Sequence, residues 1–134
     1  MRLVFVLGAL MAWASSASAD GFGFRTPSGN IFCNGSVDAG ELSCSISVRN
    51  GPTPLPRPAS CEAGWGHHFL LYQTGKVEME CGRAPRKSTY SDVAEYGISA
   101  RFGRITCRSE RTGFECLNAD GHGFFLSRKR QSVF

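Results

Sequence analysis

The pattern of apolar and polar positions along the chain predicts short β-strands rather than helices. After an apolar N-terminal run, short stretches alternate between apolar and polar residues and are rich in β-branched and aromatic side chains. Turn residues separate these stretches, and the 134-residue chain contains 16 glycines and 6 prolines. We therefore expect an all-β fold, a small single domain of antiparallel hairpins arranged as a sandwich or a partly open barrel.

The first hairpin is predicted over residues 31–48, around the loop 37–40. If Gly40 adopts the left-handed conformation that closes a four-residue loop, Cys33 lies opposite Cys44. Directly opposed residues of an antiparallel pair have Cα atoms about 4.5–5.5 Å apart, which a disulfide can span. This register therefore predicts a disulfide between the two cysteines.

A second hairpin is predicted over residues 66–81, "GHHFLLYQTGKVEMEC", with its turn at Thr74-Gly75. Side-chain alternation divides this hairpin into two faces. The face that we assign to the core holds His68, Leu70, Tyr72, Val77, Met79 and Cys81. The other face holds Phe69, Leu71, Lys76, Glu78 and Glu80. His68 is thus expected beside Cys81 at the edge of the core, and His67 is expected to point outward.

A third hairpin is predicted around Gly113. Placing this glycine at the end of a four-residue loop puts Cys107 opposite Cys116, so a second disulfide is expected there. Asp120-Gly121 forms the next turn, and residues 123–128 form one more strand. The first and third hairpins share the same order of strand with cysteine, loop ending in glycine, and returning strand with cysteine. We interpret this order as a recurring hairpin, not as an established repeat.

The segment between the first two hairpins, "NGPTPLPRPAS", alternates proline with other residues over Pro52–Pro58. Alternating proline cannot join a sheet and favours the extended polyproline II conformation. We interpret this segment as a connector that crosses from one edge of the domain to another. The alternative is an exposed, rigid loop that inhibits a secreted enzyme, and this alternative requires the segment to project from the domain.

The N-terminus has the features of a secretory signal peptide over residues 1–19. Arg2 precedes an apolar run over residues 3–14, and the small residues 17–19 form an A-x-A cleavage site. The run is shorter than the roughly 20 residues that a membrane-spanning helix needs. We expect cleavage to leave a mature domain of residues 20–134, without a stable membrane anchor, in the periplasm or outside the cell.

The cysteine count and the charge narrow the class of protein further. An even number of cysteines in a short exported chain is typical of a disulfide framework. The six cysteines are Cys33, Cys44, Cys61, Cys81, Cys107 and Cys116, and we expect each to pair with its neighbour in this order. Without Arg2 the chain keeps 14 basic and 11 acidic residues, a formal charge of +3 that is too small to indicate nucleic acid.

The charge is dense only at Arg128, Lys129 and Arg130, near the C-terminus. We interpret this run as a solvated tail. The alternative is a binding segment that is attracted to an anionic polymer of the envelope or to a membrane surface.

The histidines are the remaining candidates for chemistry. A zinc site uses cysteines two to four residues apart, whereas eight residues separate Cys107 from Cys116, so we expect neither a metal nor another cofactor. No G-x-S-x-G motif marks a nucleophile, and we assign no catalytic residue. His67 and His122 are candidate binding residues. Either is also the base if the chain is a small envelope hydrolase, which requires it to meet a serine or a carboxylate in a pocket.

Several motifs carry a resemblance that covers nearly all of residues 24–134 in order. These are "TPSGNIFC", "LSCSI", "CEAGWGHHFLL", "YGISARFGRITCRSERTGFECLN" and "GHGFFLSR". The chain resembles a family of small secreted bacterial proteins that is classified only as a domain of unknown function. The resemblance implies export, an all-β fold and paired cysteines, and it implies no catalytic residue.

Together these observations predict a monomeric, non-enzymatic binding or structural module of the bacterial envelope or exterior. An anionic envelope polymer or a secreted protein is the kind of partner that we expect, rather than nucleic acid. The hydrolase and the inhibitor of a secreted enzyme stay open as alternatives.

Overall fold

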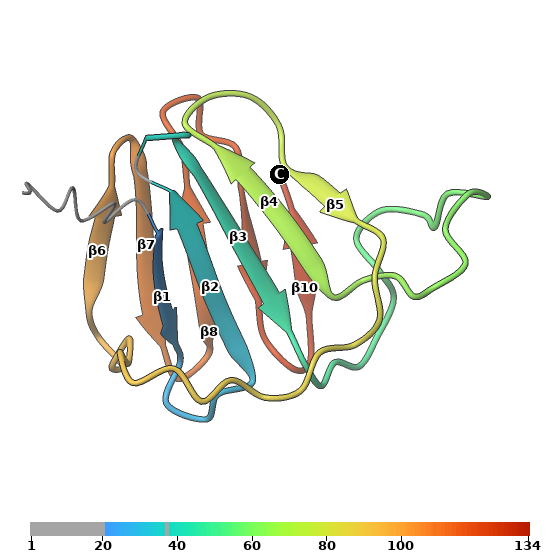
Figure 1. Ribbon diagram of the computed structural model, residues 1–134, viewed down its shortest axis with the longest axis horizontal. Helices are drawn as coiled ribbons and strands as arrows, with labels where there is room; N and C mark the ends of the chain where they lie inside the picture. The colour runs from blue at the N-terminus through green and yellow to red at the C-terminus, as the bar shows by residue number, and fades with distance from the viewer. Residues whose placement is uncertain (1–20, 37) are drawn as a thin grey trace, which may run out of the picture.

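The computed structural model describes residues 21–36 and 38–134, so the predicted signal peptide lies outside the described residues. Within this part of the chain, ten strands form two five-stranded antiparallel sheets (Figure 1). The first sheet consists of β1 (Gly21–Arg25), β2 (Ile31–Ser36), β3 (Glu41–Ile46), β4 (His68–Tyr72) and β5 (Glu78–Glu80). The second sheet consists of β6 (Ser99–Phe102), β7 (Ile105–Glu110), β8 (Gly113–Leu117), β9 (Gly123–Leu126) and β10 (Gln131–Val133).

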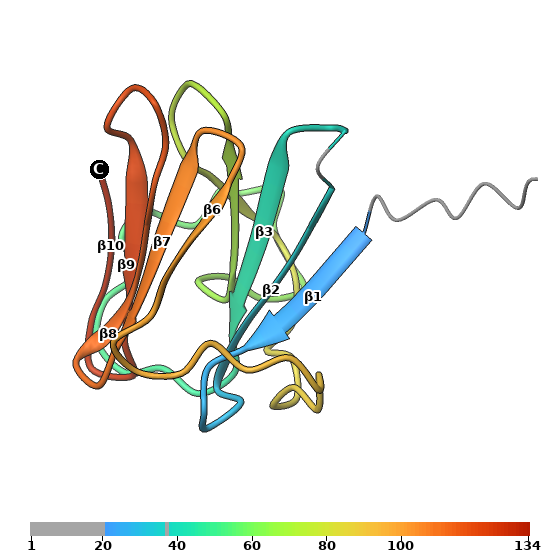
Figure 2. The same cartoon turned by 90° about the vertical axis from the view of Figure 1, so that its left-hand side faces the viewer.

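The two sheets lie face to face, as Figure 2 shows from the side. In each sheet the strands are neighbours in chain order, because every strand pairs with the one before it. The inward side chains of both sheets form one core. Its largest fully buried side chains are those of Phe69, Phe114, Phe124, Leu42, Ile46, Leu71, Ile105 and Leu126. The all-β fold is confirmed, and the chain forms the sandwich rather than the barrel.

Three disulfides join the cysteines in the predicted pairs. Cys33–Cys44 links β2 to β3 and Cys107–Cys116 links β7 to β8, with Cα–Cα distances of 4.0 and 4.1 Å. Gly40 has a φ of 64° and closes the first of these hairpins as expected. The third disulfide, Cys61–Cys81, connects the long segment after β3 to the residue that follows β5. Both in-sheet disulfides are buried in the core.

The predicted register of the second hairpin is wrong by one residue. Phe69 pairs with Met79, and Phe69 and Leu71 are fully buried, whereas they were expected on the outer face. The turn is one residue longer than predicted, so one face collects the apolar side chains and the opposite face collects the charged ones. The inner face thus holds Phe69, Leu71, Val77 and Met79, and the outer face holds His68, Leu70, Tyr72, Glu78 and Glu80.

The third hairpin has a tighter turn than predicted. Glu110 pairs with Gly113, so only Arg111 and Thr112 lie between the strands. A β-carbon on Gly113 would overlap the ring of Phe125, which explains why glycine occupies this position. The pairing of Cys107 with Cys116 is nevertheless the predicted one.

The basic run Arg128-Lys129-Arg130 is a hairpin turn rather than a solvated tail. The backbone N–H of Ser127 donates to the carbonyl of Arg130 at 2.8 Å, and its hydroxyl donates to the same oxygen at 3.0 Å. Strand β10 then pairs with β9, which the pattern of residues 131–133 did not indicate. The three basic side chains are exposed at this turn.

Residues 81–98, which we call the strap, carry the chain from the first sheet to the second. Figure 1 shows the strap running along the lower end of the first sheet from β5 to β6. Backbone hydrogen bonds fasten it along its length: Gly82 N–H to Gly64 carbonyl at 2.9 Å, and Ser88 N–H to Gly29 carbonyl at 2.9 Å. Arg25 N–H donates to the carbonyl of Asp92 at 3.0 Å.

The connections alternate between two ends of the sandwich because neighbouring strands are antiparallel. The strap end consists of residues 26–30, 47–67, 81–98, 111–112 and 127–130. The turn end consists of residues 37–40, 73–77, 103–104 and 118–122. Hydrogen bonds join the connections within each end. Examples are Asn50 N–H to Arg128 carbonyl at the strap end, 2.8 Å, and Gln73 N–H to Gly40 carbonyl at the turn end, 3.1 Å.

Candidate functional site

The strap end of the sandwich is strongly basic. Its connections, all of which the structure describes, carry nine basic side chains: Arg49, Arg57, Arg83, Arg86, Lys87, Arg111, Arg128, Lys129 and Arg130. They carry three acidic ones, Glu62, Asp92 and Glu95. The described residues of the turn end carry two of each sign, Lys76 and Arg104 against Asp38 and Asp120. The small net charge of the whole chain therefore conceals a large difference between its two ends.

A cavity of about 240 Å³, which we call the basic cavity, opens among these connections. Lys87 reaches it from the strap, Arg111 from the β7–β8 turn and Arg128 from the β9–β10 turn. Glu110 also lines the cavity, but its carboxylate is engaged by Arg108. Three cations from separate connections therefore line this space. Among the described residues that line it, the one carboxylate, that of Glu110, already has a partner outside the cavity lining.

The polar part of the basic cavity is built by the β1–β2 turn. Asn30 accepts a hydrogen bond from Val48 N–H at 2.8 Å and donates one from Nδ2 to the Val48 carbonyl at 3.0 Å. This pair fixes the turn to the chain that leaves β3. Ser28 and Ser127 line the same cavity, and the Ser127 hydroxyl is engaged by the backbone of Arg130. The wall thus combines a turn that is fixed by its own hydrogen bonds with three long cationic side chains, and these cations are the groups that can contact an anion.

Tyr96 adds an aromatic surface to the basic cavity. The guanidinium of Arg111 lies over its ring, 5.1 Å from the ring centre. The contact orients Arg111 at the surface of the protein, since Tyr96 is itself exposed to 39%. Two of the groups that line this cavity, Lys87 and Arg111, were not among the residues that the sequence suggested.

The long connection between β3 and β4, residues 47–67, extends beyond the sheets at the right of Figure 1. It contains the proline segment, of which residues 55–58 are exposed, Leu55 to 39%. Two contacts brace it: Trp65 Nε1 donates to the carbonyl of Leu55 at 2.8 Å, and Cys61 is bonded to Cys81. Leu55 also lines a small cavity with Val77 and Val133, so the segment lies partly against the edge of the sandwich and only its later residues have the projecting geometry that the inhibitor alternative requires.

His67 and His122 lie at opposite ends of the sandwich, whereas the rings of His67 and His68 have their centres 6.5 Å apart. His67 donates from Nδ1 to the Ile46 carbonyl at 2.8 Å, near the strap end, and His122 donates from Nδ1 to the Phe134 carbonyl at 3.2 Å, at the turn end. Within the described part of the chain, no hydrogen bond or ion pair joins either one to a serine or a carboxylate side chain. The structure therefore does not assemble the base that the hydrolase alternative requires.

His68, which sequence reasoning placed at the edge of the core, forms a pair with Ser45 on the outer face of the first sheet. Its Nδ1 lies 2.8 Å from Ser45 Oγ, and its Nε2 donates to the carbonyl of Arg83 at 2.8 Å. With the proton on Nε2, the neutral ring accepts the Ser45 hydroxyl, as in a nucleophile–base pair. Ser45 is only 7% exposed, however, and Gly82 of the strap lies against the His68 ring. The pair therefore fastens the strap to the sheet.

The correct register would have revealed this pair. Ser45 and His68 are direct partners in the β3–β4 ladder, and His68 in turn faces Glu80 of β5. The one-residue error in the second hairpin placed His68 on the wrong face, which hid the pair. Further along the same outer face, burial and then the charges of Glu78, Glu41 and Glu80 raise the pKa of Tyr72 above its usual value. This face thus contrasts in sign with the basic strap end.

In the described residues, no three side chains of histidine, cysteine, aspartate or glutamate gather as a metal site would require. All six cysteines are in disulfides. The described residues also form no helix that is long and apolar enough to cross a membrane.

The fold and its strap end define the class of this protein as a small, disulfide-bonded β-sandwich with one basic end. Its sequence matches the model of a family of unknown function, DUF6636, over residues 2–134, and the chain belongs to this family. This confirms the expectation, drawn from the motifs, of a family that is known only as a domain of unknown function. No curated protein and no solved structure matches the chain. Three disulfides are typical of an oxidising, exported environment.

Proposed function

We propose that the protein is an exported, non-enzymatic binding module whose strap end attaches to an anionic polymer of the bacterial envelope. In this proposal residues 1–19 are removed as a signal peptide and residues 20–134 act as a monomer. One observation carries the proposal: the strap end holds nine basic side chains against three acidic ones, and three of the cations line one cavity.

A polymer fits this end better than a single small anion. Each exposed ion pair contributes only about 0–1 kcal/mol, so useful affinity requires several contacts at once. Arg49 and Lys129 lie outside the basic cavity but on connections of the same end, where they can contact neighbouring charges of a chain-like ligand. Such binding weakens with salt, because the Debye length falls from about 10 Å at 0.1 M to about 3 Å at 1 M.

The test is retention of the mature protein on immobilised dextran sulfate during a salt gradient. We expect Arg111→Glu with Arg128→Glu to elute at much lower salt than the unchanged protein. The matched control, Lys76→Glu with Arg104→Glu, makes the same charge change at the turn end and is expected to elute only slightly earlier. Equal shifts for the two double variants would mean that net charge alone governs retention, and the proposal would fail.

A second candidate is docking of a secreted protein on the proline segment. The observation that favours it is the exposed tip, residues 55–58, on a loop braced by the Cys61–Cys81 disulfide and the Trp65 hydrogen bond. A braced, extended loop loses little conformational freedom on binding. Arg57 stands at this tip and is the side chain most available to a partner pocket.

This candidate is tested by capture of envelope proteins on the immobilised mature domain, with each captured protein identified and its affinity measured. We expect Arg57→Ala to lower the affinity for a loop-bound partner at least tenfold. The control Arg101→Ala, which replaces an exposed arginine on β6, is expected to leave this affinity unchanged. A partner that binds both variants equally does not use the loop.

A further inference from the structure

A second cavity, which we call the apolar cavity, lies at the open edge of the sandwich between β1 and β6. Its volume is about 220 Å³, and its walls include Phe24, Ile98, Ala100, Phe102 and Phe114. An apolar cavity of about 150 Å³ suffices to bind benzene. The space is therefore large enough for part of an alkyl chain.

The apolar cavity exists because the two sheets differ at one matched position. Phe24 of β1 lies opposite Cys33, whereas the corresponding residue of β6, opposite Cys107, is Ala100. A large side chain on one sheet thus faces a small one on the other. The rings of Phe22, Phe24 and Phe102 stack in near-parallel planes, with centres 4.7 and 5.4 Å from Phe102, and they form a fixed wall.

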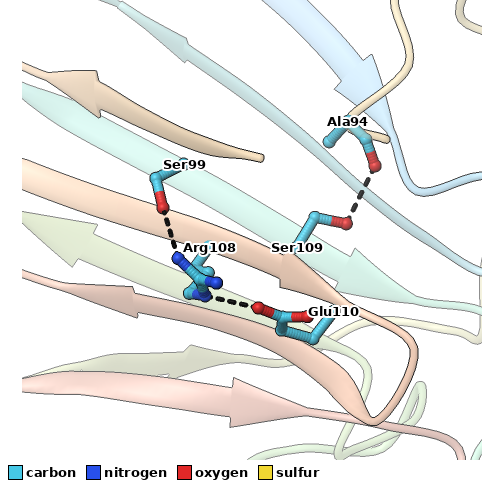
Figure 3. Close-up of polar contacts among 5 residues, drawn as sticks. All are labelled: Ala94, Ser99, Arg108, Ser109 and Glu110. Atoms are coloured by element: carbon cyan, nitrogen blue, oxygen red, sulfur yellow. Dashed lines mark hydrogen bonds and ion pairs between the residues drawn. The ribbon is translucent and has the colours of Figure 1, made fainter. Parts of the chain in front are cut away.

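Residues 93, 94 and 98 of the strap form one wall of the apolar cavity, and the strap is held in place on both sides. Ser109 Oγ donates to the carbonyl of Ala94 at 2.8 Å (Figure 3), and Ala94 N–H donates to the carbonyl of Arg25 at 2.7 Å. Ser109 N–H also donates to the carbonyl of Ile98 at 2.9 Å. These bonds connect the strap to β7 on one side and to β1 on the other, so the cavity is formed before a ligand arrives.

The apolar and basic cavities adjoin one another. Phe114 lines both of them. Along the strap, Tyr96 lines the basic cavity and Ile98 lines the apolar one. Along β7, Glu110 lines the basic cavity and its neighbour Ser109 lines the apolar one. An apolar space therefore lies directly beside a cluster of cations.

We infer that the two cavities together bind a single-chain anionic amphiphile: its alkyl chain enters the apolar cavity, and its phosphate or carboxylate headgroup meets Lys87, Arg111 and Arg128. This inference rests on the proposed function, because it assigns a ligand class to the same basic cavity. The apolar cavity admits one short chain and not the two long chains of a phospholipid. The ligand is therefore taken from solution rather than read from a bilayer.

The inference is tested on the unchanged mature protein by calorimetric titration with butyl, hexyl and octyl phosphate, each below the concentration at which it aggregates. Inorganic phosphate and 1-octanol serve as the two half-ligands. We expect affinity to rise about fourfold for each methylene group that enters the cavity, until the cavity is full. We expect octyl phosphate to bind more tightly than either half-ligand. Equal affinity for octyl phosphate and inorganic phosphate would overturn the inference.

Variants then locate the site. Ala100→Phe is expected to remove the dependence on chain length, because the new ring fills the apolar cavity, and Ala119→Phe at the turn end is expected to leave it unchanged. Arg111→Glu is expected to lower the affinity for octyl phosphate at least tenfold. Chain-length dependence that survives Ala100→Phe in a folded variant would overturn the inference.

The dextran sulfate measurement separates this inference from the function on which it rests. Retention of the unchanged protein on dextran sulfate without chain-length dependence would overturn the amphiphile site and leave the polymer-binding proposal standing. Failure of both measurements would overturn both. The titrations of the unchanged protein decide the inference even if a variant does not fold.

Discussion

The two sheets of this protein are versions of one pattern. Each is a five-stranded meander with a disulfide between its second and third strands. In the first sheet Cys44 pairs with Phe69, and in the second Cys116 pairs with Phe124. The two phenylalanine rings meet in the core with their centres 5.8 Å apart. The recurring hairpin seen in the sequence thus belongs to a larger correspondence between the halves.

The halves differ in what lies outside this shared core. The connection between the third and fourth strands is residues 47–67 in the first sheet but only residues 118–122 in the second. The second sheet shows that the core needs no more than a tight turn there. The long connection and its proline segment are therefore additions that the fold does not require, which makes them available for binding.

The comparison is tested most strongly by Phe69→Ala and Phe124→Ala. Each removes a fully buried ring at a corresponding position, and each is expected to lower the free energy of unfolding by about 3–5 kcal/mol. Urea denaturation of the mature domain measures both. If one variant loses less than half as much stability as the other, the two positions are not equivalent. Phe→Leu at the same sites provides the milder pair if an alanine variant does not fold.

The next largest effect is expected from the in-sheet disulfides. Replacing both cysteines of Cys33–Cys44, or both of Cys107–Cys116, by alanine should cost about 3 kcal/mol in each case, because the sequence separations of 11 and 9 residues restrict the unfolded chain similarly. Denaturation under oxidising conditions measures both losses. Addition of a reductant is the control, since it should bring the unchanged protein below both variants. A loss confined to one disulfide would break the correspondence.

Asn118 marks a place where the second sheet departs from the first. Asn118 follows Cys116 by two residues, just after β8, as Ile46 follows Cys44 by two residues at the end of β3. The side-chain oxygen of Asn118 accepts hydrogen bonds from the backbone N–H groups of Asp120 and His122. Its Nδ2 donates to the carbonyls of Tyr72 and Gly75 in the first sheet. Asn118→Ala is therefore expected to cost about 1–3 kcal/mol.

The measurement is again urea denaturation, with Asn34→Ala on the exposed face of β2 as the control for loss of an asparagine. The control is expected to change stability very little. If both variants behave alike, the hydrogen bonds of Asn118 between the sheets do not matter for stability.

The smallest effect is expected from Ala100→Phe, which makes the second sheet resemble the first. Filling the apolar cavity should raise the free energy of unfolding by about 0.5–2 kcal/mol. The melting temperature of the mature domain measures the change, and Ala119→Phe in the β8–β9 connection is the control. A clear loss of stability would show that the edge between β1 and β6 has no room for the ring.

The sequence predicted those parts of the fold that depend on neighbouring strands. Gly40 closes a short loop, so the partner of Cys33 follows from local geometry alone. The predicted register of the second hairpin was wrong because its longer turn gives no comparable local signal. The predicted and the observed register both fit the local sequence, and only packing against the core selects one of them. Strands β1, β6 and β10 are short and contain glycine, serine or charged residues, so pattern alone did not distinguish them from loops.

The candidate site could be predicted only in part. Arg128–Arg130 stood out as a dense run, but Lys87 and Arg111 are ordinary exposed residues in sequence and join Arg128 only through the fold. His67 and His122 stood out by residue type, and the structure gives each a carbonyl partner and keeps them at opposite ends. Ser45 gave no sequence signal because its partner His68 was assigned to the wrong face.

By itself the sequence determined the all-β class, the paired cysteines and the resemblance to a family of unknown function, because alternation, turn glycines, cysteine spacing and short motifs act over a few residues. The tertiary structure decided that five connections begin and end at one end of the sandwich and that basic side chains of three of them line one cavity there. The physical reason is that a sandwich places every second connection at the same end, whatever its distance along the chain. The charge asymmetry and the two adjoining cavities are properties of the packed sheets, and no local pattern encodes them.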